Sequence, residues 1–232
     1  MPASTIGMPV LEFIQLSRKL KYIGRGAFSH CTNVKTVVMP DTVKRIEDSA
    51  FSCCLQLVYI KLSKNLEYIG RSAFTFCKNL TSIFIPPSCQ EIGNGAFKDC
   101  WKLMILSVPR HTVLGERLIA GNTALIKASP FKTNCFGEYY DNKQEINDWI
   151  KNVNHGRDEF ALHRECSSCS PPSEERLYEL VKECGLLSIN TKNEIGMTVL
   201  KYLQENPFFE IQVDEKNLMN RYILDLIGEI TI

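Results

Sequence analysis

The chain has 232 residues, of which 44% are hydrophobic and 23% charged, ordinary values for a globular protein. Its net charge of +1 comes from 27 basic and 26 acidic residues, so the whole-chain charge gives no reason to expect nucleic acid or an anionic membrane as a partner. The N-terminus has no secretory signal pattern and no stretch approaches the ~18 apolar residues of a spanning helix, so we expect a cytoplasmic protein without a membrane partner.

An Ala-Phe-x-x-Cys motif recurs four times along the first half of the chain, with an offset of 23 residues each time. Other apolar columns keep the same offset, and Pro or Ser closes each unit. The apolar columns are Ile23, Ile46, Ile69 and Ile92; Val34, Leu57, Leu80 and Leu103; Val37, Ile60, Ile83 and Leu106; and Met39, Leu62, Ile85 and Val108. The closing residues are Pro40, Ser63, Pro86 and Pro109. A unit this short cannot bury its own apolar residues, so the pattern predicts a solenoid of stacked copies.

Each unit contains one stretch that alternates like a β-strand, as in Leu80 to Ile85. Ile83 and Ile85 would point inward and Phe84 outward. One such strand per coil would give a parallel sheet with rungs ~4.8 Å apart. A second, shorter extended segment is expected near Ile92, and the Gly24, Gly70 and Gly93 column predicts a tight bend that glycine enters freely.

In-register stacking predicts two internal columns. The aromatic column consists of Phe28, Phe51, Phe74 and Phe97, and the thiol column of Cys31, Cys54, Cys77 and Cys100. Parallel Cα–Cβ bonds at the strand spacing do not suit a disulfide, which needs Cβ atoms ~3.8 Å apart and turned toward each other. We therefore expect free thiols that pack as small hydrophobic groups.

The unit from Leu66 to Pro86, L-x-x-I-G-x-x-A-F-x-x-C-x-x-L-x-x-I-x-I-P, resembles the BspA-type leucine-rich repeat. The resemblance covers residues 15–130 and implies an α/β repeat solenoid that presents a curved sheet to a ligand. After Val108 the repeat decays, with Ala120 and Thr123 in place of Phe and Cys. We therefore expect residues 1–130 to form the solenoid, with an N-terminal cap from Val10 to Leu20 and a worn last unit as its end.

From Asp141 the apolar period becomes helical, with Ile146, Trp149, Ile150 and Val153 on one stripe. Further helices are predicted from Ser173 to Gly185 and from Glu215 to Ile227. Residues 160–166 and 185–200 resemble parts of an ankyrin repeat, the second through its N-x-x-G-x-T-x-L spacing. The sequence thus predicts residues 131–232 as an all-α, ankyrin-like tail that caps the solenoid, a layout that resembles a set of diatom leucine-rich-repeat proteins.

One His/Cys group in the tail suggests an alternative chemistry. His163, Cys166, Cys169 and Cys184 have spacings compatible with a zinc or redox site, although a structural role for each is favoured. No nucleophile elbow, HExxH, kinase set or P-loop occurs, so we expect no enzyme, no catalytic residue, no metal and no cofactor. A zinc- or redox-dependent protein and a structural assembly unit remain alternative functions.

The outward strand face is the candidate binding surface. Apolar side chains with a basic edge suit a protein partner. The candidate partner-binding residues are Lys35, Tyr59, Lys61, Phe84, Met104 and Ile105. We expect a non-enzymatic interaction scaffold, in which replacing Phe84 by Asp leaves the fold intact but abolishes binding. The sequence identifies neither the partner nor the oligomeric state.

Overall fold

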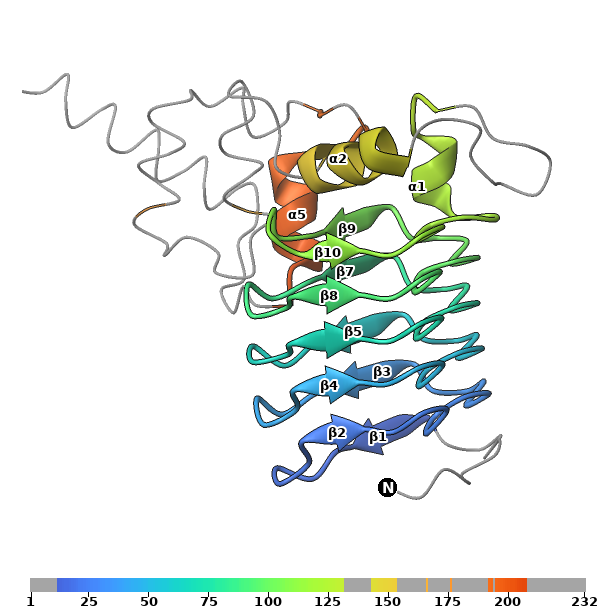
Figure 1. Ribbon diagram of the computed structural model, residues 1–232, viewed down its shortest axis with the longest axis vertical. Coiled ribbons are helices and arrows are strands. Elements are labelled where there is room, and N and C mark those ends of the chain that lie inside the picture. The colour runs from blue at the N-terminus through green and yellow to red at the C-terminus, as the bar shows by residue number, and fades with distance from the viewer. Residues whose placement is uncertain are drawn as a thin grey trace, which may run out of the picture. The chain divides into compact units, whose positions relative to one another are not determined.

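The computed structural model describes residues 12–131, 143–153, 166, 176, 192–193 and 195–207. The chain divides into two compact units, Met1–Asn152 and Val153–Ile232. The first unit contains the repeats, which form a solenoid of short parallel strands joined by turns. Figure 1 shows these coils stacked in chain order, from β1 and β2 to β9 and β10.

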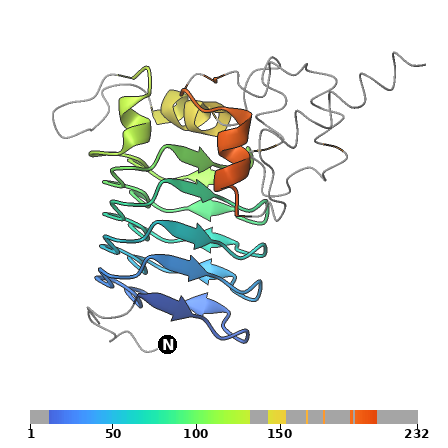
Figure 2. The same cartoon turned by 180° about the vertical axis from the view of Figure 1, so that it is seen from behind.

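Each coil contributes two short strands, one to each side of the solenoid (Figures 1 and 2). One side contains β1 (Phe13–Gln15), β3 (Thr36–Val38), β5 (Tyr59–Lys61), β7 (Ser82–Phe84) and β9 (Ile105–Ser107). The other contains β2 (Tyr22–Ile23), β4 (Arg45–Ile46), β6 (Tyr68–Ile69), β8 (Glu91–Ile92) and β10 (Val113–Leu114). The second extended segment of each coil is therefore a strand of its own, where the sequence predicted one strand per coil.

The sequence offset sets the strand register. Val37 pairs with Ile60, and Ile46 pairs with Ile69, 23 residues later in each case. The even-numbered strands form one five-stranded parallel sheet, in the order β10-β8-β6-β4-β2. The odd-numbered side is assigned as two pieces, β1-β3-β5 and β7-β9. Because every copy faces its own equivalent, apolar columns in the sequence become continuous apolar columns in the core.

The aromatic column is confirmed. The rings of Phe28, Phe51, Phe74 and Phe97 stack in succession, with centroids 5.2, 5.3 and 5.6 Å apart and planes within 15° of parallel. Phe51, Phe74 and Phe97 are fully buried. The backbone of this segment is also paired between coils, since Phe51 N–H donates to the Ala73 carbonyl at 2.8 Å. The turn segments of successive coils are therefore stacked in the same register as the strands.

The thiol column is confirmed as free and buried, and it has a hydrogen-bonding role that the sequence did not suggest. The Sγ atoms of Cys54, Cys77 and Cys100 donate to the carbonyls of the phenylalanines 26 residues earlier, at 3.2, 3.3 and 3.1 Å. In the worn last unit, Thr123 Oγ1 makes the equivalent contact with the Phe97 carbonyl, at 3.4 Å. Burial raises the pKa of Cys54 to about 12, so this thiol is neutral at neutral pH.

The glycine column exists for a different reason from the one predicted. Gly70 and Gly93 do not have positive φ angles. A Cβ atom added at either position would lie 2.5 Å from a backbone nitrogen of the neighbouring coil. Glycine therefore allows close approach of two backbones here. The left-handed bends fall two residues later, at Gly26, Ser49, Ser72 and Gly95, and again at His30, Cys53, Phe76 and Asp99.

Two helices follow the last coil, α1 (Ala124–Lys127) and α2 (Lys143–Val153). The predicted stripe of α2 is confirmed, since Ile146, Ile150 and Val153 are buried. Trp149 is half-buried, and its ring meets that of Phe131 edge-on at 5.9 Å between centroids. The predicted N-cap, Asp141, lies outside the described residues.

In the second unit, the structure describes one helix, α5 (Val199–Glu205). A turn precedes it, in which Asn193 Oδ1 accepts hydrogen bonds from the N–H groups of Ile195 and Met197. Gly196 has a φ of +78°, and the Thr198 side chain caps the helix by accepting from Lys201 N–H. The helices predicted at 173–185 and 215–227 lie outside the described residues, so an ankyrin-like tail stays a prediction. Within the described ranges, no helix is long and apolar enough to cross a membrane.

We predict that Phe74→Ala lowers the free energy of unfolding by about 3–5 kcal/mol, because it removes a fully buried ring stacked between two others. Urea denaturation followed by circular dichroism measures this loss. Tyr22→Ala is the control, because Tyr22 is 52% exposed and its removal leaves no cavity. Equal losses of unfolding free energy in the two variants would contradict a larger contribution of the buried phenylalanine column to stability.

Candidate protein-interaction surface

The odd-numbered strands place alternate side chains on the outside of the solenoid, and the exposure of these side chains changes along its length. In β3 and β5 the middle residue is buried and its neighbours are exposed or half-buried. In β7 and β9 all three residues are buried. Among these four strands, the accessible residues therefore belong to β3 and β5.

The structure separates the six predicted binding residues into two groups. Lys35 and Tyr59 are exposed, and Lys61 and Met104 are half-buried. Phe84 and Ile105 are each 1% exposed. The expectation that these two form part of an exposed patch is wrong. A residue with almost no accessible surface cannot contact a partner in this conformation, so we leave both out of the surface discussed below.

Two exposed valines were missed as candidate residues. Val38 is 44% exposed and Val58 is 47% exposed, against 37% for Tyr59. The repeat places Val38 in the column of Lys61, and Val58 in the column of Lys35, so the sequence contained the signal that would have found them. We call Lys35, Val38, Val58, Tyr59 and Lys61 together the β3–β5 face.

The β3–β5 face is held in place by the sheet. Thr36 lies opposite Tyr59, and Val38 lies opposite Lys61, in the parallel pairing of β3 with β5. Lys35 N–H donates to the Glu12 carbonyl, and its own carbonyl accepts from Val58 N–H at 2.9 Å. Backbone bonds on both sides thus fix the spacing of the exposed side chains before any partner arrives.

The face combines apolar area with positive charge. The Lys35 ammonium lies 3.6 Å from a Glu12 carboxylate oxygen, but both side chains are more than half exposed, so this ion pair is weak. Partial burial raises the pKa of the Tyr59 hydroxyl, which keeps the phenol neutral and able to donate a hydrogen bond. Such a surface can bind a complementary apolar and polar surface, and it holds no nucleophile beside a base.

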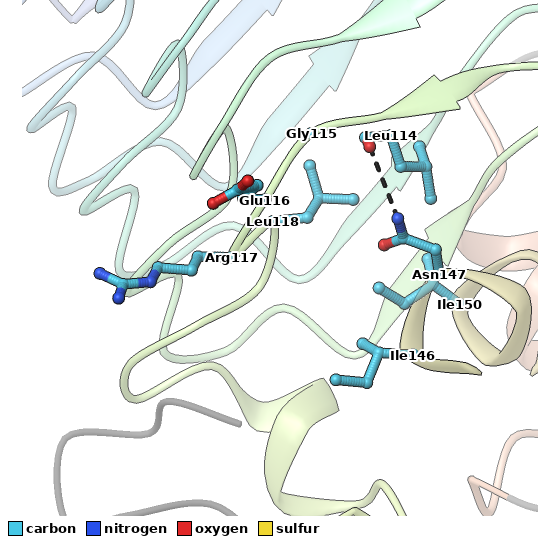
Figure 3. A pocket seen from close by; sticks show the side chains of 8 residues that line it. All are labelled: Leu114, Gly115, Glu116, Arg117, Leu118, Ile146, Asn147 and Ile150. Atoms are coloured by element: carbon cyan, nitrogen blue, oxygen red, sulfur yellow. Dashed lines mark hydrogen bonds between the residues drawn. The ribbon is translucent and has the colours of Figure 1, made fainter. Parts of the chain in front are cut away.

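Two hollows elsewhere in the first unit have structural explanations. A pocket of about 80 Å³ lies between the last coil and α2, with Leu114, Leu118, Ile146 and Ile150 around it (Figure 3). Asn147 Nδ2 donates to the Leu114 carbonyl across it, at 3.5 Å. This is the seam where α2 packs on the end of the repeats, and its volume suits only a few atoms.

A wider groove of about 450 Å³ runs past the turns before β4, β6 and β8. Its polar side chains already bind neighbouring coils. Lys44 Nζ bonds Glu67 Oε1 at 2.7 Å, Asp41 Oδ1 accepts from Lys64 N–H, and Ser88 Oγ donates to the Lys64 carbonyl. These bonds join successive coils, so the groove is part of the scaffold.

No group of three or more potential metal ligands occurs among the described residues. Of the suggested zinc or redox group, only Cys166 is described, and it is buried, with its carbonyl accepting from Asn206 Nδ2. His163, Cys169 and Cys184 lie outside the described residues.

Comparison with known proteins identifies the repeat. The family model described as "BspA type Leucine rich repeat region" matches residues 8–126, in six copies. The chain is similar to a leucine-rich-repeat protein of T. pallidum, with 27% identity and a TM-score of 0.42, over 47% of this chain and 50% of that one. No protein of curated function matches it significantly.

Two further solved structures are similar. One is a leucine-rich cell surface protein from Faecalibacterium prausnitzii A2-165, with 25% identity and a TM-score of 0.44, over 61% of this chain and 35% of that one. The other is a leucine-rich-repeat protein from Bacteroides ovatus ATCC 8483, with 26% identity and a TM-score of 0.38, over 49% of this chain and 35% of that one. The chain thus spans half or less of the length of each of these proteins.

We predict that Phe84→Asp destabilises the fold by at least about 3 kcal/mol, because it removes a buried ring and places a carboxylate in its position. Tyr59→Asp should cost no more than about 1 kcal/mol, since its site is exposed. Thermal and urea unfolding of the two variants distinguish these cases. A Phe84→Asp protein as stable as the wild type would show that Phe84 is accessible after all.

Proposed function

The chain belongs to the BspA-type leucine-rich-repeat family, and from that premise we propose that it is a non-enzymatic module whose β3–β5 face binds a protein partner. Leucine-rich-repeat proteins generally mediate protein–protein interactions. The observation that carries the proposal is the exposure of Val38, Val58 and Tyr59 near two lysines, on or directly before the paired strands β3 and β5.

Physical chemistry supports this assignment. Exposed apolar side chains gathered on a rigid sheet lose little conformational entropy when a partner covers them. Tyrosine is frequent among residues that dominate binding energy, because it buries a large area and keeps a polar tip. Lys35 and Lys61 would favour acidic groups at the edge of the partner's surface. In this proposal, the valines and Tyr59 supply affinity, and the lysines supply orientation.

Other parts of the proposal rest on the sequence. A scaffold role, a cytoplasmic location and an ankyrin-like tail are supported by the patterns described above. A zinc- or redox-dependent function through His163, Cys166 and Cys169, and a purely structural role in an assembly, remain the alternatives. Among the described residues, no group of potential metal ligands favours the zinc-dependent alternative.

The test is affinity capture from an extract of the source cells, with quantitative mass spectrometry. We predict that Val58→Asp combined with Tyr59→Asp loses proteins that the wild type retains, because it places two carboxylates in the apolar part of the face. Tyr22→Asp is the matched control, because Tyr22 is 52% exposed on the opposite sheet.

The wild type and the Tyr22→Asp control should retain the same proteins, and the wild type and both variants should unfold at similar temperatures. Equal retention by the Val58→Asp, Tyr59→Asp double variant, or loss confined to Tyr22→Asp, would contradict the assignment of the β3–β5 face.

A further inference from the structure

A second exposed surface lies on the turn side of the solenoid, in the segments that connect each even-numbered strand to the next odd-numbered strand. Phe76 and Trp101 are 38% and 47% exposed there. They lie on adjacent coils, whose backbones are hydrogen-bonded to each other in this segment. Phe76 N–H donates to the Lys98 carbonyl at 3.0 Å, and Lys102 N–H donates to the Lys78 carbonyl at 3.2 Å. We call Phe76, Lys78, Lys98, Trp101 and Lys102 the turn-side patch.

Phe76 is an unfavourable residue for its backbone position. Its φ of 60° lies in the left-handed region, where a bulky side chain is a rare exception. The equivalent residues in other coils are His30, Cys53 and Asp99, and the last one is Gly121. Glycine, asparagine or aspartate fits this conformation with less strain. Phe74 fills the core of the same coil, so an exposed, strained ring at Phe76 points to a use outside the fold.

Three lysines lie within three residues of one of the two rings in the sequence. The Lys78 ammonium lies 4.0 Å from the centre of the Trp101 ring, a cation–π contact that fixes both side chains. Lys98 is half-buried, and Lys102 is exposed. The acidic residue in this segment, Asp99, is only 8% exposed, and its Oδ1 accepts from Asn122 N–H at 3.0 Å. The accessible charge of the turn-side patch is therefore positive.

The patch belongs to a region that is far more basic than the chain as a whole. Residues 12–131 contain 16 lysines and arginines against 8 aspartates and glutamates, a net charge of +8. The rest of the chain contains 11 basic and 18 acidic residues, a net charge of −7, and the two nearly cancel in the total of +1. Close to the patch its own accessible lysines determine the sign of the field, which favours acidic partners.

We propose that the turn-side patch binds an acidic polypeptide segment that carries an aromatic or large apolar side chain. The apolar side chain packs against Phe76 and Trp101, and the carboxylates bind Lys98 and Lys102. Single-stranded nucleic acid fits less well, because bases need open ring faces for stacking and Lys78 already lies over one face of Trp101. This patch is separate from the β3–β5 face.

The test is fluorescence anisotropy with a labelled peptide that repeats Glu-Phe-Asp-Leu. Its counterpart with lysine at every acidic position and a thymidine oligonucleotide are the comparison probes. The full-length chain should bind the acidic peptide at least about tenfold more tightly than either comparison probe, a difference of about 1.4 kcal/mol. Tighter binding of the oligonucleotide, or no binding of the acidic peptide, overturns the proposal.

Variants assign the binding to the patch. Lys98→Glu with Lys102→Glu should weaken binding of the acidic peptide at least about tenfold. Lys19→Glu with Lys64→Glu makes the same charge change in the turns that lead from odd-numbered to even-numbered strands, and it should weaken binding much less. An equal loss of peptide affinity in both pairs would mean that the overall charge of the chain attracts the peptide, which overturns the proposal.

Phe76→Asn should also weaken peptide binding, and this variant should unfold at or above the wild-type temperature. Unchanged peptide affinity in this variant would contradict the proposal. Tyr59→Asp should bind the peptide like the wild type, which separates this patch from the proposed β3–β5 face.

Discussion

Stacking of equivalent side chains from successive coils is the constraint on which the rest of the structure depends. The rings of Phe28, Phe51, Phe74 and Phe97 follow one another at 5.2–5.6 Å, close to the spacing of neighbouring strands. One register therefore satisfies ring contacts, strand hydrogen bonds and thiol–carbonyl bonds together. A shift of one residue in any coil would break all three kinds of contact. For this reason a short repeat with few core residues can still specify a single packing register.

The same constraint divides the surface into parts with different freedom. Inward columns must repeat, because each side chain packs on its equivalent. Outward columns need not repeat, and they carry Val58 and Tyr59 on one side and Phe76 and Trp101 on the turn side. Both exposed groups rest on backbone that is hydrogen-bonded to a neighbouring coil. A repeat of this kind supplies rigid, closely spaced positions whose side chains can change without altering the core.

The sequence predicted the interior well because a column of identical residues has one structural explanation. It predicted the Phe and Cys columns and the register. It failed at Phe84 and Ile105, because burial of an outward side chain depends on the surrounding fold, about which the repeat carries no information. The role of Gly70 was missed because glycine serves close approach as well as left-handed bends. The charge division was available in the sequence but was hidden by averaging over the whole chain.

The most direct measurement of in-register stacking is a pair of double-mutant cycles on unfolding free energy. Phe51→Leu with Phe74→Leu removes two rings that touch, and Phe28→Leu with Phe97→Leu removes two rings separated by the others. We predict a coupling energy of about 0.5–1.5 kcal/mol for the first pair and additive effects for the second. Additive effects in both pairs would contradict a continuous column of contacting rings.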